Sequence, residues 1–307
     1  MTSLAGLPPI GPAALTLGVF DGVHRGHAAL LEATRAAAGP ASSVALVFDP
    51  HPDELLRPGT RVPRLAPLPV NLQGIMALGV DHAVPLRFDD ALRSLSPEAF
   101  LEALAPSIDL RALTMTPESA FGKGRAGTLE RMRQLGAERG FSVIAVEPVV
   151  VEDAPISSSR IRAAIAEGAV EAAHRLLGHA AYLEGTVVRG DRRGRELGFP
   201  TANLEFDYLP ALPALGIYLG TIAVPDRQLG PGHPALVSVG VRPTFHEHGR
   251  VLVEVYLLDW DGDLYGTRLQ VRLLERLREE RRFEGVDPLI KQMRLDEVEA
   301  RHRLGIG

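Results

Sequence analysis

The chain has 307 residues, enough for two domains of ordinary size, and 46% of them are hydrophobic, which excludes a globally disordered protein. The net charge of −5 argues against nucleic-acid binding by bulk electrostatics, and the absence of cysteine excludes disulfides, thiol catalysis and cysteine-built zinc or iron–sulfur sites. The first residues lack the pattern of a secretory signal, and no apolar run has the length of a membrane span. We therefore expect a cytoplasmic protein without a membrane or nucleic-acid partner.

A glycine-rich turn joins the first predicted strand to the first predicted helix. The apolar run Ala14–Phe20 predicts a buried strand, and the alanine- and leucine-rich run Ala28–Ala38 predicts an amphipathic helix. Between them, His24 and His27 are expected to project to the same side at the helix start, where backbone N–H groups and the helix dipole favour an anion such as a phosphate chain. The turn lacks the Gly-Lys-Ser/Thr ending of a Walker A loop. On the residues alone, a tight turn with two solvated histidines remains the alternative.

Strands and helices alternate as far as about residue 151. Strands are predicted at Val44–Phe48, His82–Leu86, Leu110–Met115 and Ser142–Val151, and helices at Asn71–Leu78, Ser96–Leu104 and Thr128–Arg139. Ser96 is an expected N-cap because Pro97 and Glu98 follow it. The proline-rich stretch Arg57–Pro69 predicts a surface connection. The alternation predicts a doubly wound parallel sheet, with helices on both faces.

Two later stretches of this half have residues suited to phosphate. Gly122–Gly127 matches the pattern G-x-G-x-x-G, but a dinucleotide fingerprint follows the first strand, whereas this stretch comes late and after a polar segment. Ser157 and Ser158, at a predicted helix start, are followed by Arg160 and Arg162, and together they offer several donors to an anion. An ordinary capped surface helix is the alternative for the second stretch.

The pattern changes after a helix predicted at Gly168–His179. Strand-length runs separated by glycine and proline turns are found at Tyr182–Val188, Gly216–Val224, Ala235–Val239, Val251–Leu258 and Arg268–Leu274. They predict a small antiparallel barrel or sandwich, and a terminal helix from Asp287 is expected to pack on it. We place the domain boundary near Leu177, which gives domains of residues 1–177 and 178–307.

The stretch Gly185–Leu204 contains glycines, several arginines and a Pro-Thr-x-Asn sequence that we interpret as a turn. The hydroxyl of Thr201 and the amide of Asn203 offer oxygens that suit Mg²⁺ bound beside substrate phosphates. A solvated arginine-rich loop is the alternative. Further on, Glu254 shares one face of a predicted strand with apolar residues, and from the pattern alone its charge is expected to face solvent.

These motifs together resemble the bacterial bifunctional riboflavin kinase/FAD synthetases. Residues 18–27 resemble the HxGH signature of the nucleotidyltransferase superfamily in its FAD synthetase form, and residues 48–52, 121–127 and 156–162 resemble further segments of that family. The 48–52 segment gives weight to Asp49 and His51, and the 121–127 segment is a mobile loop beside the nucleotide in that family. Residues 194–203 resemble the riboflavin kinase signature, and the resemblance continues to the end of the chain.

The resemblance implies two Mg²⁺-dependent reactions that use ATP. The C-terminal barrel would phosphorylate riboflavin to FMN with Glu254 as the general base, and the N-terminal sheet domain would adenylylate FMN to FAD, with His24 and His27 supporting the charge on the α-phosphate. The implied ATP site of the adenylyltransferase comprises Gly18, Phe20, Asp21, Gly22, His24, His27, Ser157, Ser158, Arg160 and Arg162. The implied ATP and flavin site of the kinase comprises Gly190, Gly194, Arg195, Gly198, Pro200, Thr201 and Asn203, of which Thr201 and Asn203 would also hold Mg²⁺.

The segment Thr116–Gly122 departs from the family pattern. Glu118 stands where the family has Asp or Asn, and Ser119 replaces an aromatic residue. One extra methylene displaces a carboxylate by about 1 Å, the scale on which positioned groups lose catalytic power. Two alternatives therefore stand beside the bifunctional enzyme, namely an active kinase with an impaired adenylyltransferase half, and a flavin-sensing regulatory protein that does not react. The oligomeric state cannot be predicted from the sequence.

Overall fold

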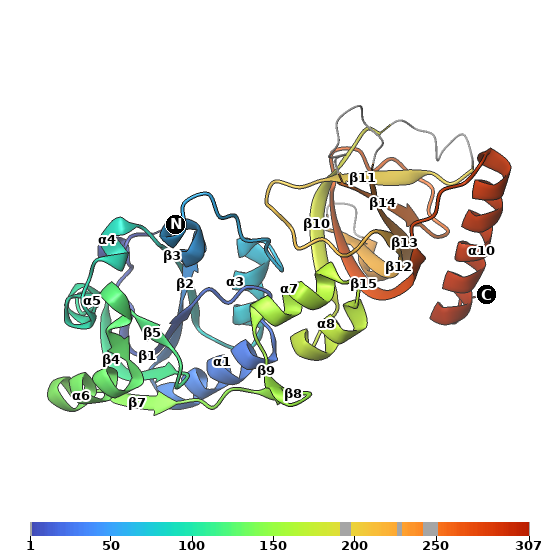
Figure 1. Cartoon of the computed structure of the whole chain (residues 1–307). Helices are drawn as coiled ribbons and strands as arrows, with labels where there is room; N and C mark the ends of the chain where they lie inside the picture. The colour runs from blue at the N-terminus through green and yellow to red at the C-terminus, as the bar shows by residue number, and fades with distance from the viewer. Residues whose placement is uncertain (1, 191–197, 226–228, 242–250, 307) are drawn as a thin grey trace. The chain divides into compact units, whose positions relative to one another are not determined.

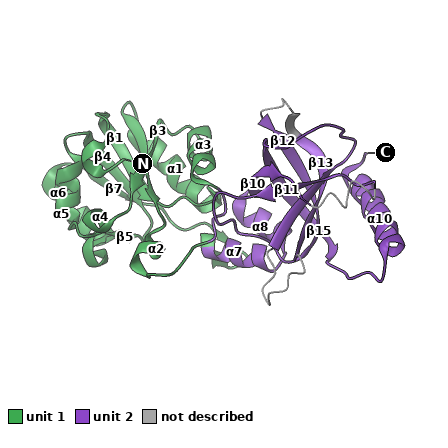
Figure 2. Ribbon diagram, turned by 90° about the horizontal axis from the view of Figure 1, so that it is seen from above, with its two compact units in different colours: residues 1–62, 67–158 green, residues 63–66, 159–307 purple. Residues whose placement is uncertain are grey.

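The computed structural model describes residues 2–190, 198–225, 229–241 and 251–306, and for 229–231 the backbone alone. The chain divides into two compact units, shown in green and purple in Figure 2. The first unit comprises residues 1–62 and 67–158, and the second comprises residues 63–66 and 159–307. Each unit has its own sheet, while the domain boundary near Leu177 stays a prediction.

The first unit is built on a five-stranded parallel sheet. Its order is β3 (His82–Arg87), β2 (Ser42–Asp49), β1 (Gly11–Gly18), β4 (Ile108–Met115) and β7 (Ser142–Ala145). Every neighbouring pair is parallel, so the doubly wound sheet is confirmed. The order of the strands reverses beside β1, and in such sheets ligands bind at the carboxyl ends of the strands at this switch point. The glycine-rich turn that follows β1 therefore begins at the expected ligand position.

Helices cover both faces of this sheet, and apolar side chains of its strands pack against them on each side (Figure 1). In β2, Val44 and Leu46 join the core formed with α5 (Pro97–Leu104) and α6 (Leu129–Arg139). Ala45 and Val47 join the other core, formed with α1 (Arg25–Ala38) and α3 (Leu68–Ala77). Ser96 caps α5 as predicted, since its side chain accepts a hydrogen bond from the backbone N–H of Ala99. The shorter elements of the unit are η1 (Leu4–Gly6), α2 (Pro52–Leu56), α4 (Asp90–Arg93), β5 (Ala120–Phe121), η2 (Lys123–Arg125), β6 (Gly127–Thr128), β8 (Val150–Val151) and β9 (Ala154–Pro155).

Two expectations about this half are wrong. The strand predicted at Ser142–Val151 ends at Ala145, and Val150–Val151 instead forms a separate hairpin with Ala154–Pro155. A continuous strand through Pro148 is disfavoured because proline has no N–H to donate to a ladder. The stretch Arg57–Pro69 is not wholly a surface connection. Leu65 and Ala66 are buried, and residues 63–66 belong to the second unit, where Arg64 forms a bridge with Pro210.

The second unit is a closed antiparallel barrel that follows α7 (Ser158–Ala166) and α8 (Val170–Leu177). The strands follow the order β10 (Ala181–Val188), β11 (Thr201–Glu205), β14 (Val251–Leu257), β13 (Leu229–Val241), β12 (Gly216–Val224) and β15 (Arg268–Glu279). The prediction of a small barrel is confirmed, with β11 as a strand that the sequence did not indicate. In the described part of the chain, no helix is both long and apolar enough to cross a membrane.

The terminal helix α10 (Val286–Leu304) packs on the outer face of the barrel, as predicted (Figure 1). Ala300 of α10 is fully buried against Leu219, Leu236 and Leu258. Beside this apolar contact, the guanidinium of Arg278 on β15 makes a two-pronged ion pair with Asp296, with an Nη2–Oδ2 distance of 2.6 Å. The two side chains are 12% and 8% exposed, so the pair is shielded from water.

Removing one partner of this buried pair should destabilise the second unit strongly. Asp296→Ala leaves the guanidinium of Arg278 buried without its carboxylate, and we expect the free energy of unfolding to fall by about 3–5 kcal/mol in denaturant titrations. The matched control is Glu299→Ala on the same helix, which removes the partly exposed pair with Arg303 and should cost about 0–1 kcal/mol. Equal losses in the two variants would contradict the role given to the buried pair.

Candidate functional site

The glycine-rich turn after β1 has a strained backbone. Phe20, Gly22 and Val23 have φ angles of 52°, 75° and 39°. A positive φ is easy for Gly22, but for Phe20 and the β-branched Val23 it costs about 1–3 kcal/mol each. Two other glycines make room for rings. A Cβ on Gly18 would lie 3.2 Å from the ring of Phe20, and one on Gly26 would lie 3.2 Å from the ring of His24.

The two histidines of the turn stack on each other. Their ring centroids are 3.6 Å apart with an interplanar angle of 15°, and Phe20 lies against His27 at a centroid distance of 5.1 Å. His24 is the N-cap of α1, and its Nδ1 accepts a hydrogen bond from the backbone N–H of His27 at 3.2 Å. An accepting Nδ1 leaves the ring proton on Nε2, which can then donate to a ligand. The prediction that both rings lie on the same side of the helix start is confirmed.

His27 is held in its neutral form. Burial lowers the pKa of His27 well below its usual value of 6.5, and the neighbouring His24 lowers it further. Its Nδ1 is buried and has no hydrogen-bond partner among the residues that the structure describes. Buried polar atoms are nearly always bonded, so an orphaned nitrogen at a helix N-terminus is an observation that favours a ligand there.

One serine of the serine–arginine stretch contacts this turn. The Oγ of Ser158 donates to the carbonyl oxygen of Asp21 at 3.3 Å, and Asp21 is almost fully buried. Ser157 immediately precedes α7, while Arg160 and Arg162 lie on this helix in the second compact unit. There the Nε of Arg162 donates to the carbonyl oxygen of Pro63 at 2.7 Å.

The unusual segment before the G-x-G-x-x-G pattern forms a compact turn. The hydroxyls of Thr116 and Ser119 are 2.7 Å apart, and the carboxylate of Glu118 is exposed to solvent. The pattern itself follows β4 and β5 rather than the first strand, so the structure confirms that it is not placed as a dinucleotide fingerprint. His51, in the other turn noted in the sequence, caps α2 by accepting from the backbone N–H of Asp53 at 3.1 Å.

A second group of polar side chains lies on neighbouring strands of the barrel. Asn203 on β11 is directly opposite Glu254 on β14, and the hydroxyl of Thr201 donates to Oε1 of Glu254 at 3.4 Å. Thr201 and Asn203 are not in a turn, as the sequence suggested, because they alternate with the buried Ala202 and Leu204 and so share the outer face of a strand.

The backbone just after β10 approaches this group closely. A Cβ on Gly190 would lie 2.4 Å from Nδ2 of Asn203, so no other residue can stand at position 190 without displacing that amide. Pro200 immediately precedes β11, and Gly198 has a φ of 85° that favours glycine. The predicted site residues Gly194 and Arg195 lie outside the described residues.

Two polar residues near the predicted sites were missed from the sequence. Ser238 on β13 is directly opposite Glu254, so it extends the row formed by Asn203 and Glu254 across three strands. Asn71 is buried on α3, and its Oδ1 accepts a hydrogen bond from the backbone N–H of Gly22 at 2.9 Å. Strand alternation could have indicated Ser238, whereas nothing in the sequence pairs residues 22 and 71, which are far apart in the chain.

Mg²⁺ is compatible with the oxygen atoms of the barrel group. Among the described residues, no group of three or more histidine, aspartate and glutamate side chains could hold a metal by itself. Thr201, Asn203 and Glu254 instead offer a hydroxyl, an amide oxygen and one carboxylate on adjacent strands. This small set of oxygen donors suits Mg²⁺, which retains water ligands and binds through substrate phosphates.

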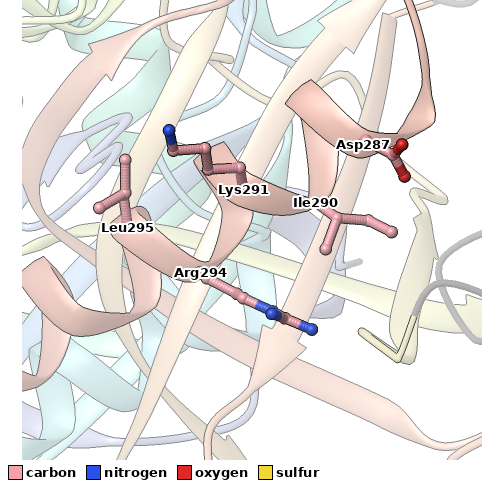
Figure 3. Close-up of a pocket in the computed structure, with 5 residues that line it drawn as sticks. All are labelled: Asp287, Ile290, Lys291, Arg294 and Leu295. Carbon is pink, nitrogen blue, oxygen red and sulfur yellow. The ribbon is translucent and has the colours of Figure 1, made fainter.

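An open hollow lies beside the terminal helix. Figure 3 shows five side chains from a single helix, α10, that line it: Asp287, Ile290, Lys291, Arg294 and Leu295. None of the residues predicted for either site lines this hollow. The two candidate sites are therefore defined by their side-chain geometry and not by this pocket.

Comparisons with known proteins agree on one family. A model of FAD synthetase matches residues 10–160, and a model of riboflavin kinase matches residues 177–304. Proteins named bifunctional riboflavin kinase/FMN adenylyltransferase from Listeria monocytogenes and Pseudomonas fluorescens are 35% and 37% identical to this chain, over 94% and 93% of it and 91% of each relative. The chain belongs to the bifunctional riboflavin kinase/FMN adenylyltransferase family. The relative from Escherichia coli K12 is 34% identical over 95% of this chain and 93% of its own length.

A solved structure also matches this chain over nearly the whole length of both. It has a TM-score of 0.88 and 30% sequence identity, and the match covers 98% of this chain and 97% of that one. That crystal structure is described as a macrolide-efflux protein from Streptococcus pneumoniae. The likeness supports the fold, and the efflux activity is a statement about that protein alone.

The lowered pKa of His27 predicts how stability depends on pH. Because the folded-state pKa lies below the unfolded value, only the unfolded chain gains this proton as the pH falls through about 6.5. The free energy of unfolding of the first unit should therefore decrease below this pH, by up to about 1.4 kcal/mol per pH unit from this group. His27→Gln removes the group, so denaturant titrations at several pH values should show a shallower loss. An identical pH dependence in the variant would contradict a neutral His27.

Proposed function

We propose that the chain phosphorylates riboflavin to FMN in its barrel and adenylylates FMN to FAD in its sheet unit, with ATP as the donor in both reactions. The observation that carries the proposal is the convergence of Thr201, Asn203 and Glu254 on adjacent strands, on a chain that also has a stacked histidine pair at the sheet switch point. The family relationship supports both activities. The substrates of both reactions are small molecules. Because both reactions use ATP, we propose a cytoplasmic location.

In the kinase reaction, Glu254 acts as the general base. Its carboxylate accepts the proton of the ribityl 5′-hydroxyl, whose oxygen then attacks the γ-phosphorus of ATP while ADP leaves. The hydrogen bond from Thr201 and the opposite position of Asn203 hold the carboxylate on the outer face of the barrel. Gly190, Gly198 and Pro200 place the backbone around Asn203 and the start of β11 and, with Gly194 and Arg195, are proposed to contact ATP or flavin.

In the adenylyltransferase reaction, the phosphate oxygen of FMN attacks the α-phosphorus of ATP and pyrophosphate leaves. His24 and His27 donate hydrogen bonds to the α-phosphate, where negative charge increases in the transition state. The neutral imidazole of His27 suits this role as a hydrogen-bond donor, and the helix N-terminus adds its dipole. Gly18, Phe20, Asp21, Gly22, Ser157, Ser158, Arg160 and Arg162 are proposed as the remaining ATP contacts.

Mg²⁺ is proposed as the metal of both reactions. In the barrel, Thr201 and Asn203 would hold it beside the phosphates of ATP, where it would neutralise the charge of the transferring group. The protein residues themselves position the hydroxyl, the base and the phosphates.

A second candidate function rests on the segment at Glu118. Glu118 and Ser119 stand where the family pattern has Asp or Asn and an aromatic residue. The carboxylate of Glu118 is exposed, and the hydroxyl of Ser119 is hydrogen-bonded to that of Thr116. This observation favours an enzyme with an active kinase and a weakened adenylyltransferase. A flavin-sensing protein without turnover is the third candidate, and the positioned base Glu254 argues against it.

A product assay on the purified chain separates these candidates. Riboflavin, ATP and Mg²⁺ are incubated with the protein, and the flavins are separated by chromatography. FAD is the expected product. FMN alone would identify the kinase with an impaired adenylyltransferase, and unchanged riboflavin would contradict both enzymatic candidates.

Glu254→Gln tests the general base. The amide keeps the size of the side chain and still accepts a hydrogen bond from Thr201, but it cannot take the proton of the hydroxyl. We expect the kcat of riboflavin phosphorylation to fall by about 10²–10⁴-fold, with little change in the KM for ATP. Formation of FAD from supplied FMN serves as the internal control and should be unaffected. A kcat within a few-fold of the parent would contradict this role of Glu254.

Gly190→Ala tests the close approach of the segment after β10 to Asn203. The added methyl group would lie within 3 Å of the amide and must displace it, so we expect kinase activity to fall at least about 10-fold while the conversion of FMN to FAD is retained. The control is Gly285→Ala in the same unit, where the new methyl group meets only an ordinary contact at 3.9 Å. Full kinase activity in Gly190→Ala would show that Asn203 is not held as described.

A further inference from the structure

The strained turn Phe20–His24 is held from the side by helix α3. Val23 has a φ of 39°, an outlier for a β-branched residue, so the surrounding structure must stabilise this conformation. Val23 packs in the core that contains Ile75 and Leu72 of α3. The helix therefore contacts the turn that carries the stacked histidines, although the sequence motif of the turn gives no indication of it.

Asn71 makes a specific polar contact with this turn. Its side chain is 4% exposed, and its Oδ1 accepts the backbone N–H of Gly22 at 2.9 Å across a sequence separation of 49 residues. Gly22 stands two positions before His24, and His24 is the N-cap that bonds the backbone of His27. The orientation of the Gly22 peptide thus influences the position of the two imidazole rings.

Gly74, about one helical turn further along α3, leaves space for the side chain of Val23. A Cβ at this position would lie 3.2 Å from Cγ2 of Val23, which is tighter than an ordinary contact. Residues 71 and 74 are three apart and face the same side of the helix. One helix face therefore provides both a hydrogen-bond acceptor for Gly22 and space for Val23.

We propose that Asn71 and Gly74 are positioning residues for adenylyl transfer, which act by holding the turn that aims His24 and His27. This inference rests on the proposed function of the first unit. Asn71 and Gly74 are not proposed to contact substrate. They fix the peptide at Gly22 and the side chain of Val23, so a change at either position moves the histidine pair rather than removing a ligand.

The test measures FAD formation from FMN and ATP by the full chain. Asn71→Leu keeps the approximate size of the side chain but removes the acceptor, and we expect kcat to fall by about 10–100-fold, as for a displacement of about 1 Å. Asn71→Asp restores an acceptor for Gly22 and should recover most of the kcat. Its negative charge near the phosphates should instead raise the KM for ATP.

Gly74→Ala separates positioning from stability. Alanine is a better helix former than glycine, so the melting temperature should be unchanged or higher, while the new methyl group presses on Val23 and lowers kcat. The matched control is Leu135→Ala on α6, in the core on the other face of the same sheet. It removes apolar packing from the same unit without touching Val23, and it should lower the melting temperature without lowering the kcat of the folded protein. Riboflavin phosphorylation by each variant reports on the integrity of the other unit.

A second readout does not depend on turnover. The imidazole signals of His24 and His27 in a histidine-labelled chain should shift in Asn71→Leu and in Gly74→Ala but not in Leu135→Ala. Unchanged signals, or a kcat that falls only in proportion to the unfolded fraction, would overturn the inference. A parent chain that made FMN but no FAD would contradict the proposed function of the first unit, while the imidazole signals would still decide whether Asn71 and Gly74 hold the turn.

Discussion

Both candidate sites depend on the same constraint, a planar side chain that packs closely against the backbone of a glycine. In the first unit, the ring of His24 lies against Gly26 and the ring of Phe20 lies against Gly18. In the barrel, the amide of Asn203 lies against Gly190. These close approaches restrict the orientation of the planar groups without using further side chains.

The two units place their polar groups by different structural means. The histidine pair occupies a helix start at the switch point of a parallel sheet, where backbone N–H groups and the helix dipole favour phosphate. The barrel group depends on cross-strand pairing, because the antiparallel register puts Asn203, Glu254 and Ser238 in one row on the outer face. Anion binding at a helix start suits a pair of hydrogen-bond donors, and the row of oxygens suits a base beside a cation.

Much of this could be predicted from the sequence, because local signals decide the elements concerned. The alternation of predicted strands with predicted helices indicated the parallel sheet, and the Ser96-Pro97 start of α5 was correct because an N-cap and a first-position proline are local features. The position of His24 and His27 at the start of α1 followed from the apolar runs on either side of the turn, and their spacing indicated that both rings lie on the same side. The prediction that Thr201 and Asn203 lie in a turn was wrong. A short stretch of polar residues after a proline resembles a turn in the sequence, and the strand that it pairs with, β14, lies about 50 residues away, so no local signal indicates the pairing.

Contacts between distant segments could not be predicted in this way. The bond from Gly22 to Asn71 and the burial of Leu65 and Ala66 arise only when the chain is folded. The close approach of Gly190 to Asn203 is of the same kind, although the glycine itself was noted. Such contacts have no periodicity or capping signal, and they are the ones that give each site its geometry.

The central claim is that one chain contains two sites that catalyse consecutive reactions, each with its own residues. Complementation between two disabled chains tests it most directly. The Glu254→Gln chain and a chain with His24→Ala and His27→Ala are each incubated with riboflavin, ATP and Mg²⁺, first separately and then mixed. The account predicts almost no FAD from either chain alone, FMN as the product of the histidine variant, and FAD from the mixture. Efficient conversion of riboflavin to FAD by either variant alone would contradict it.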